Sequence, residues 1–215
     1  MKKLILMVVC ILSAFAATAQ SKVTWSMEVG AGMSAWMGND ADGSNALFNP
    51  KVGVGIDIPL TGLVSFKTGL NWVSKGASYK TQVADLLSEN VSVSKVKVNQ
   101  NYFQMPFLAA FHVGTPSNFD MVFTVGPYIA YGISGKSETE IDALTVSWDT
   151  FDDLKISNVK MAEGFNEFDA GLQAGIALDF RKWTLGVDGD FGLCKIAPKT
   201  SAYNFGFFVK VGYKF

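Results

Sequence analysis

The sequence predicts an all-β fold: an eight-stranded antiparallel up-and-down transmembrane β-barrel, preceded by a cleavable signal peptide. Three observations lead to this prediction. Large apolar residues alternate with small or polar ones in eight separate segments, and the connections between those segments are alternately short and long. In addition, 49% of the 215 residues are hydrophobic and only 17% are charged, whereas soluble domains are roughly 25% charged.

The N-terminus has the pattern of an export signal. Two lysines precede an apolar stretch that ends in an Ala-Thr-Ala cleavage site. We expect cleavage after Ala19, which divides the chain into a signal peptide (1–19) and an outer membrane β-barrel domain (20–215). One cysteine, Cys194, then remains, so no intrachain disulfide can form, and we expect an inert buried thiol there.

The first four alternating segments form the first half of the expected barrel. Residues 23–36 are followed by a long connection before 50–60, and 63–75 by a long connection before 99–113. The second and third segments are joined by a Thr-Gly turn alone. Period-2 alternation of this kind predicts strands, and each segment is long enough to cross a bilayer at a tilt.

The last four segments, 120–133, 166–180, 183–194 and 205–215, repeat the pattern. An even number of strands with short turns at one end and long loops at the other is typical of outer-membrane barrels, so we expect an outer-membrane location. The expected long loops are 37–49, 76–98, 134–165 and 195–202.

Alternation alone does not distinguish this barrel from a lipocalin-type barrel, whose apolar face points inward. The composition of the second face of the segments distinguishes the two barrels, because that face mixes glycine with isolated charges such as Lys51, Asp57 and Asp188. Glycine would only weaken a solvated outer face, whereas inside an eight-stranded barrel it leaves room for the charges. The bulky face, with Leu172, therefore faces lipid, and Gln173 points inward. The aromatic residues expected on the lipid face, mostly near strand ends, are Trp25, Trp72, Trp183, Tyr131, Tyr203, Tyr213 and Phe215.

The last segment keeps its alternation up to the terminal Phe215. In lipid every backbone group must be paired, so the barrel must close and the last strand must pair with the first. A terminal Phe after alternating apolar residues also resembles the signal by which the barrel-assembly machinery recognises its clients. Lys210 stands where that signal usually has glycine, and Gly212 falls one place off.

Three stretches, NYFQMPFLAAF, GPYIAYGISGK and FDAGLQAGIALDF, occur in this order along the chain. They resemble strands of the PorT-like outer membrane β-barrel domain family. Gln104 takes the place of that family's usual glutamate. The resemblance implies an eight-stranded outer-membrane barrel and no single activity, although the founding type is linked to a secretion and gliding apparatus.

No catalytic, metal or cofactor site is expected. His112, the only histidine, lies beside a short turn, away from the end where outer-membrane enzymes meet their substrates. Asp40, Asp42 and Ser44 begin a calcium-loop pattern, but Lys51 occupies the twelfth position, where such a loop needs a bidentate glutamate. A net charge of -1 gives no basis for nucleic-acid binding.

Inward-facing charges are expected to plug the barrel. An unpaired ammonium is strongly unfavourable in a dry interior, so a carboxylate partner is expected, with water as the alternative. Lys210 lies level with Glu28 on strand one and Asp188 on strand seven, its neighbours after closure, and is expected to pair with one or both. Asp57 lies opposite Lys67 across the Thr-Gly turn and is expected to pair with it. The large residues expected to fill the remaining interior are Tyr102, Tyr128 and Phe208.

The expected function is structural or interaction-based, without catalysis, through the long extracellular loops. ALTVSWDTF within 134–165 and VSVSKVKV within 76–98 alternate again, and exposed strand edges invite partner strands. Expected partners are outer membrane lipid, the barrel-assembly machinery during insertion and an extracellular or envelope protein. Two alternatives stay open: a small porin-like or ligand- or ion-binding barrel, and an accessory component of a secretion apparatus.

Overall fold

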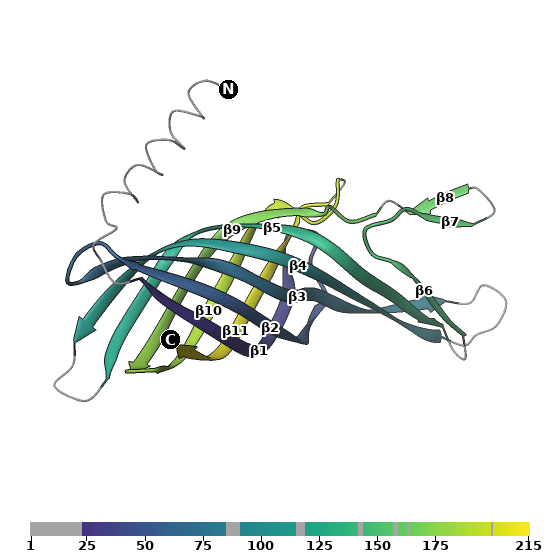
Figure 1. Cartoon of the computed structure of the whole chain (residues 1–215). Helices are drawn as coiled ribbons and strands as arrows, with labels where there is room; N and C mark the ends of the chain where they lie inside the picture. The colour runs from purple at the N-terminus through teal and green to yellow at the C-terminus, as the bar shows by residue number, and fades with distance from the viewer. Residues whose placement is uncertain are drawn as a thin grey trace, which may run out of the picture.

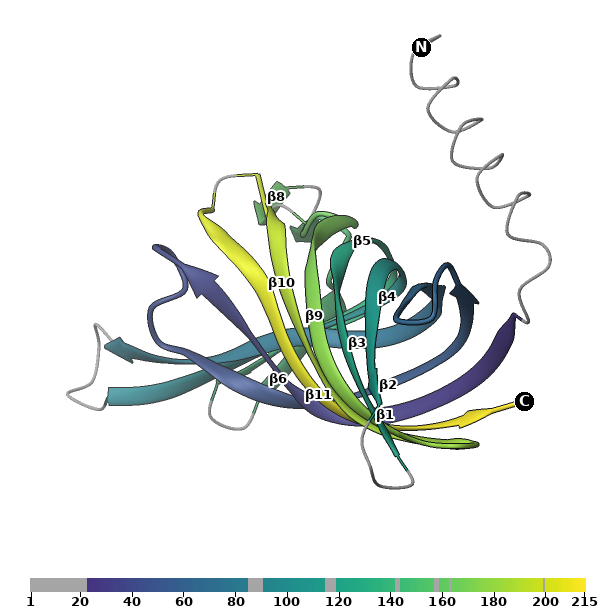
Figure 2. The same ribbon diagram turned by 90° about the vertical axis from the view of Figure 1, so that its left-hand side faces the viewer.

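The computed structural model describes residues 23–84, 91–114, 119–141, 144–156, 159–162, 164–198 and 200–215. The expected signal peptide lies outside these residues. Eight antiparallel strands form a closed barrel (Figures 1 and 2). The barrel strands are β1 (Thr24–Gly38), β2 (Ser44–Pro59), β3 (Val64–Ala84), β4 (Val91–Gly114), β5 (Asp120–Ile141), β9 (Phe168–Phe180), β10 (Trp183–Lys195) and β11 (Ala202–Lys214).

Three short strands lie outside the barrel wall. Strand β6 (Leu144–Asp149) pairs with the end of β5, and β7 (Leu154–Ile156) forms a separate hairpin with β8 (Val159–Ala162). Figure 1 shows all three at the end of the barrel where the longest strands project. Within the described residues, no helix is long and apolar enough to cross a bilayer.

Closure joins the two ends of the barrel domain. Strand β1 pairs with β11 from Ser26 opposite Lys214 to Gly38 opposite Ala202. The backbone N–H of Phe215 donates to the Trp25 carbonyl at 2.9 Å, so pairing continues to the last residue. Figure 2 shows β9, β10 and β11 side by side in the wall. The structure thus confirms the expectation that the last strand pairs with the first along its whole length.

The two faces of the wall follow the sequence prediction. Leu172 is 49% exposed on the outer face, whereas its neighbour Gln173 is 2% exposed and points inward. Trp25 and Trp183 are each 57% exposed and belong to the strand ends near the short turns. Burying an apolar face against lipid removes it from water just as a protein core would, so the usual inside-out pattern of soluble proteins is reversed.

The short turns are confirmed. Strand β2 ends at Pro59 and β3 begins at Val64, while β9 and β10 are joined by Arg181 and Lys182 alone. Arg181 has a φ of 52°, the left-handed conformation that tight two-residue hairpin turns require. Because the number of barrel strands is even, Trp25 and Phe215 lie together at the same end as these turns.

The loops at the other end are shorter than expected, because strand continues into them. Strand β3 extends to Ala84 and β4 begins at Val91, so most of the predicted loop 76–98 is a hairpin. VSVSKVKV is not a free edge, since Lys97 pairs with Ser78 on β3 and with Glu138 on β5. β-Branched residues alternating with polar ones favour strands, and here they find partners on both sides.

A proline interrupts the ladder between β3 and β4. Pairing stops after Thr68 opposite Phe107 and resumes at Asn71 opposite Gln104, with Pro106 between them. Proline has no backbone N–H to give to a neighbouring strand. The Thr68 hydroxyl donates to the Pro106 carbonyl at 2.8 Å, which satisfies one backbone group at the gap.

Candidate functional site

The candidate site is the lumen of the barrel, where inward side chains form two polar clusters along the axis. The turn-side cluster lies nearer the short turns and comprises Glu28, Lys51, Gln104, Gln173, Asp188, Asp190 and Lys210. The loop-side cluster lies nearer the long strands' ends and comprises Lys75, Tyr128, Asp169 and Asn204. Alternation sends these side chains inward from all eight barrel strands, and closure brings them together.

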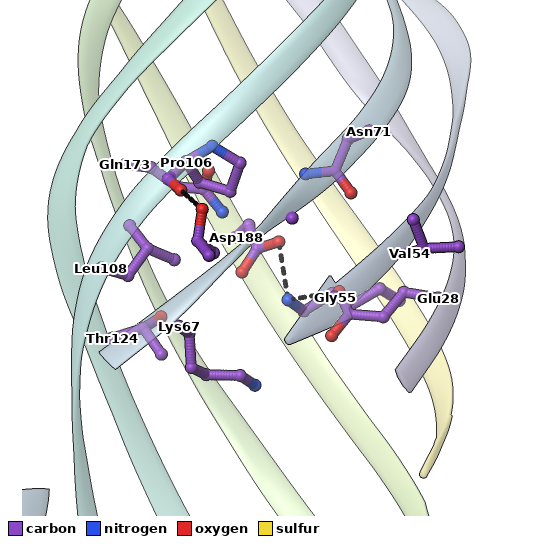
Figure 3. A pocket seen from close by; sticks show the side chains of 13 residues that line it. Glu28, Val54, Gly55, Lys67, Asn71, Pro106, Leu108, Thr124, Gln173 and Asp188 are labelled. Atoms are coloured by element: carbon purple, nitrogen blue, oxygen red, sulfur yellow. Dashed lines mark hydrogen bonds and ion pairs between the residues drawn. The ribbon is translucent and has the colours of Figure 1, made fainter. Parts of the chain in front are cut away.

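Lys210 contacts both carboxylates expected for it. Its Nζ lies 2.9 Å from Glu28 Oε2 on β1 and 3.0 Å from Asp188 Oδ2 on β10. Dashed lines in Figure 3 mark these contacts to Glu28 and Asp188. In register, Lys210 lies opposite Gly30 on one neighbour and Gly186 on the other. The two glycines leave room beside the lysine stem, so its head reaches the carboxylates two residues along each strand.

Lys51 extends the turn-side cluster across the lumen. Its Nζ on β2 lies 3.5 Å from Asp188 Oδ2 and 3.4 Å from Asp190 Oδ2 on β10. Gln104 donates to the same Asp190 oxygen at 3.1 Å. The sequence marks Lys51 as inward-facing, but no signal assigns its partners, because β2 and β10 are not neighbours. Paired and hydrogen-bonded charges of this kind are the form in which ions are tolerated in a buried place.

The loop-side cluster is built around a fully buried lysine that the sequence analysis did not identify. Lys75 is 0% exposed, and its Nζ lies 3.2 Å from Asp169 Oδ2. It also donates to the Tyr128 hydroxyl at 3.2 Å and lies 4.3 Å from the centre of that ring. The Tyr128 hydroxyl in turn donates to Asp169 Oδ2 at 3.1 Å, and the Asn204 side-chain amide donates to the same Asp169 oxygen at 3.4 Å. An ammonium against a ring face is a favourable cation–π contact.

Aromatic side chains close the lumen around and above the loop-side cluster. Tyr102, Tyr128 and Phe208 are at most 1% exposed, which confirms that they fill the interior. Phe151, which follows β6, turns back over the barrel, and its ring lies 5.8 Å from that of Tyr102. Beyond it an apolar cap forms a small core at the barrel mouth, made of Trp36, Ala41, Ala77, Tyr79, Val96, Val98, Phe165, Ile196 and Ala202.

The second expected ion pair is not made. Asp57 lies opposite Lys67 in the β2–β3 register, as predicted, but the structure records no contact within 4.0 Å between their charged groups. Asp57 Oδ2 instead lies 3.9 Å from Nε2 of His112. In Figure 3 the long Lys67 side chain extends separately from the contacts of Glu28 and Asp188. Backbone register determines the position of the lysine Cα, whereas the conformation of the four-carbon side chain determines the position of the ammonium group.

Lys67 lines a small cavity next to the turn-side cluster. The cavity has a volume of about 30 Å³, and Glu28, Asp188 and Lys210 also line it (Figure 3). A site of this size with several polar partners has room for one or two water molecules. Water, the alternative partner weighed for these charges, therefore fits beside Lys67.

His112 does not form a hydrolytic site. Ser65 Oγ lies 2.8 Å from His112 Nε2, and Asp57 Oδ2 approaches the same nitrogen at 3.9 Å. A catalytic triad needs the nucleophile on one ring nitrogen and the carboxylate on the other. Ser65 is also only 2% exposed, so a substrate has no access to its hydroxyl.

The remaining candidate residues have ordinary structural roles. Asp40 accepts a hydrogen bond from the Ser201 backbone N–H at 2.6 Å, and Ser44 accepts one from the Trp36 backbone N–H at 3.2 Å. Across the described ranges, no group of three or more His, Cys, Asp or Glu side chains is placed to hold a metal ion. Cys194 is partly exposed rather than buried, because it lies at the barrel mouth beside a cleft.

Several solved structures are similar to this chain. The attachment invasion locus protein Ail of Yersinia pestis is 10% identical with a TM-score of 0.41, covering 90% of this chain and 99% of that chain. OprG from Pseudomonas aeruginosa is 14% identical with a TM-score of 0.44, covering 91% and 97%. Neisserial surface protein A is 8% identical with a TM-score of 0.40, covering 89% and 97%. No match was found among curated proteins.

The sequence also matches a family directly. Residues 17–197 match the family described as outer membrane protein beta-barrel domain. This match spans most of the chain and agrees with the closed barrel, its apolar outer face and its polar lumen. The chain therefore belongs to the outer membrane protein beta-barrel domain family, and it is an integral protein of the outer membrane.

Proposed function

We propose that this protein is a non-catalytic interaction protein of the outer membrane, acting through a sheet that projects from the loop end of the barrel. The observation that carries this proposal is strand length. Strands β3, β4 and β5 have 21, 24 and 22 residues, whereas the other five barrel strands have 13 to 16. Each residue adds about 3.4 Å to a strand, so the three long strands and β6 form a four-stranded projection.

The projection has two unpaired edges in the described part of the chain. Strand β6 pairs with β5 only, and residues 80–84 of β3 pair with β4 only, because the β2–β3 ladder stops at Tyr79. Unpaired backbone N–H and C=O groups at a sheet edge are a template for an added strand from another protein. An edge beyond the membrane is free to make such a contact.

The orientation of the barrel in the membrane determines on which side of the membrane the projection can bind a partner. We expect the short turns to face the periplasm and the projection to face the cell exterior, following the length rule for such barrels. Ser147, exposed on β6, is a suitable reporter in a chain whose Cys194 is replaced by serine. A membrane-impermeant thiol reagent should label Ser147→Cys in intact cells and should not label Thr61→Cys, at the opposite end. If only Thr61→Cys were labelled, the short turns would face the cell exterior and the proposed orientation would be wrong.

The interaction itself is tested by photo-crosslinking in native membranes. A photoreactive residue at Ser147 should give a heavier adduct with a second protein, whereas the same residue at Thr61, also exposed but in a short turn, should not. Absence of any adduct from Ser147, in membranes where the protein is folded, would remove the proposal.

A secretion-related role is the second candidate. The three PorT-like motifs form β4, β5 and β9, which are neighbouring strands, and they contribute Gln104, Tyr128 and Asp169 to the two lumen clusters. That the three motifs lie side by side in the wall supports a PorT-like assignment. If that role holds, loss of this protein should reduce export of secreted proteins, and the photo-crosslinked partner should be a component of the export apparatus.

A porin-like role is disfavoured by the packed lumen. The buried Lys75, Tyr102 and Phe208 occupy its middle, and the apolar cap covers its loop end. The purified protein should therefore show no ion-conducting steps in planar bilayers. Steady conductance through single molecules would restore the porin alternative.

A further inference from the structure

Two hollows of similar size lie on the surface of the barrel, and their linings differ. The first, of about 510 Å³, is on the lipid face near Trp25, and its walls are apolar side chains apart from Thr68. The second, of about 590 Å³, is a cleft at the loop end of the barrel, lined by four aromatic rings together with an amide, a carboxylate, an ammonium and a thiol. Volumes between about 300 and 1,000 Å³ with a few fixed polar groups are typical of small-molecule sites.

The loop-end cleft exists because the two ladders of β9 end at different heights. Strand β9 pairs with β5 up to Phe168 opposite Tyr131, but with β10 only up to Gly171 opposite Gly192. The last residues of β10 therefore stand apart from the start of β9, and Cys194 borders the gap between them. The cleft is thus a feature of the barrel wall.

Two of the four rings that line the cleft are exposed. Tyr131 and Phe168 are 55% and 53% exposed, and because they lie opposite one another in the β5–β9 ladder, their side chains are neighbours on one face. The other two rings, of Phe151 and Phe165, are half-buried by packing against aromatic rings of the lumen and the cap. The exposed pair offers aromatic surface that an apolar part of a ligand can cover.

Hydrogen bonds hold the polar groups of the cleft in place. The Asn166 backbone N–H donates to the Ile196 carbonyl at 2.7 Å, and its side-chain amide donates to the Lys195 carbonyl at 2.8 Å. The Tyr131 hydroxyl donates to Oε2 of Glu167. A carboxylate has about four lone-pair sites, so this bond orients the Glu167 group and leaves it capacity to accept further hydrogen bonds.

The charges of the lining cancel. Among the described residues that line the cleft, Glu167 carries a carboxylate and Lys195 carries an ammonium, and both are exposed. An anionic ligand would be repelled by the first group and a cationic ligand by the second, which favours a neutral ligand. Hydroxyl groups suit both, because a hydroxyl can donate to a carboxylate and accept from an ammonium.

We propose that the loop-end cleft binds a neutral sugar, as a pyranose unit of a membrane glycolipid or of a free oligosaccharide. A pyranose ring has a face of C–H groups, which packs on the exposed rings of Phe168 and Tyr131, and a rim of hydroxyls. These hydroxyls donate to the Glu167 carboxylate and accept from the Lys195 ammonium, and hydrogen bonds to charged groups are the stronger kind. The site does not depend on the function proposed for the projecting sheet.

Saturation-transfer NMR on the protein in nanodiscs measures binding, with the methyl glycosides of glucose, galactose and mannose as probes. At least one probe should receive magnetisation from the protein, most strongly at the C–H protons that contact the aromatic rings. Cys194 gives a second measurement, because the only other cysteine, Cys10, lies in the expected signal peptide. A bound probe covers the cleft, so it should slow the alkylation of Cys194 by N-ethylmaleimide.

Phe168→Ala should weaken binding of that probe by roughly two- to tenfold, as expected for loss of one aromatic contact. Glu167→Gln should weaken it less, because an acceptor remains although the charge is lost. Phe48→Ala is the matched control: Phe48 is 74% exposed on β2 and is not among the residues that line the cleft, so binding should not change. Heat-modifiable migration in gels checks that each variant has folded.

The two sources of sugar are distinguished by the octyl glycoside of the sugar that binds, which carries the same head group on an apolar chain. Tighter binding of the octyl glycoside than of the methyl glycoside would assign the cleft to membrane glycolipids, and equal binding would assign it to free oligosaccharides. The proposal is overturned if no probe receives magnetisation and Cys194 is not protected, or if Phe168→Ala binds the probe as well as Phe48→Ala does.

Discussion

The two clusters in the lumen hold a buried lysine in different ways. Lys210 lies between two carboxylates on neighbouring strands, at 2.9 and 3.0 Å. Lys75 has one carboxylate, Asp169 at 3.2 Å, and adds the hydroxyl and ring of Tyr128. Both lysines are buried, yet the turn-side cluster uses charge pairing and the loop-side cluster uses one charge pair with aromatic contacts.

The two clusters differ in how many lysines neutralise each buried carboxylate. Asp188 keeps a second lysine, Lys51 at 3.5 Å, whereas the structure gives Asp169 no second lysine within 4.0 Å among the described residues. Removing a cation from the turn-side cluster therefore leaves its carboxylates partly compensated. Removing Lys75 leaves a buried carboxylate with neutral hydrogen-bond donors alone.

Lys75→Met should cause the largest loss of stability. Asp169 is 2% exposed and would lose its counter-ion, and breaking a buried pair by removing one partner costs about 3–5 kcal/mol. The free energy of unfolding, measured by guanidinium titration from lipid vesicles, should fall by that amount. Lys75→Met combined with Asp169→Leu should recover part of it, and an equal loss in single and double variants would show that Asp169 is not the cause.

Lys210→Met should cost less, about 1–3 kcal/mol, because Asp188 retains Lys51 and Glu28 keeps some solvent exposure. The same unfolding titration measures it. Adding Lys51→Met should then lower stability by more than the sum of the two single changes, by about 0.5–3 kcal/mol for contacting residues. A cost for Lys210→Met above that for Lys75→Met would reverse the comparison between the clusters.

Lys67→Met should change the free energy of unfolding by no more than about 0.5 kcal/mol. Lys67 lies beside the turn-side cluster but makes no ion pair within 4.0 Å in the part of the chain the structure describes. Asp57→Asn serves as the matched partner: a double-mutant cycle should show no coupling between Asp57 and Lys67. Strong coupling would mean that the ion pair predicted from register forms after all.

Glu138→Gln should have the smallest effect, although Glu138 pairs closely with Lys136 at 2.6 Å on the exposed part of β5. The hydrogen bond and charge of Lys136 lower the pKa of the Glu138 carboxyl. A lowered folded-state pKa gives stability that is present above the unfolded pKa and is lost as pH falls through the folded pKa. Solvent screens this pair, so the variant should match the unaltered protein at pH 7, while NMR titration should place the Glu138 pKa below its ordinary value.

Much of the barrel follows from alternation and loop length. The eight strands, the lipid face with Leu172, the inward Gln173 and the paired terminus at Phe215 are all readable from the sequence, because strand periodicity fixes faces and lipid requires closure. The expected partners of Lys210 followed from the same reasoning, since closure makes β1 and β10 its neighbours.

Only the tertiary structure decided which groups meet across the lumen and beyond the membrane. Lys51 reaches Asp190 from a non-neighbouring strand, a contact set by barrel shear, which the sequence does not encode locally. Asp57 and Lys67 share a register, yet their charged groups make no ion pair within 4.0 Å. Phe151 folds back onto Tyr102 from a segment that alternation would leave in solvent. Backbone pattern determines which side a residue faces, whereas side-chain reach and long-range packing determine what it touches.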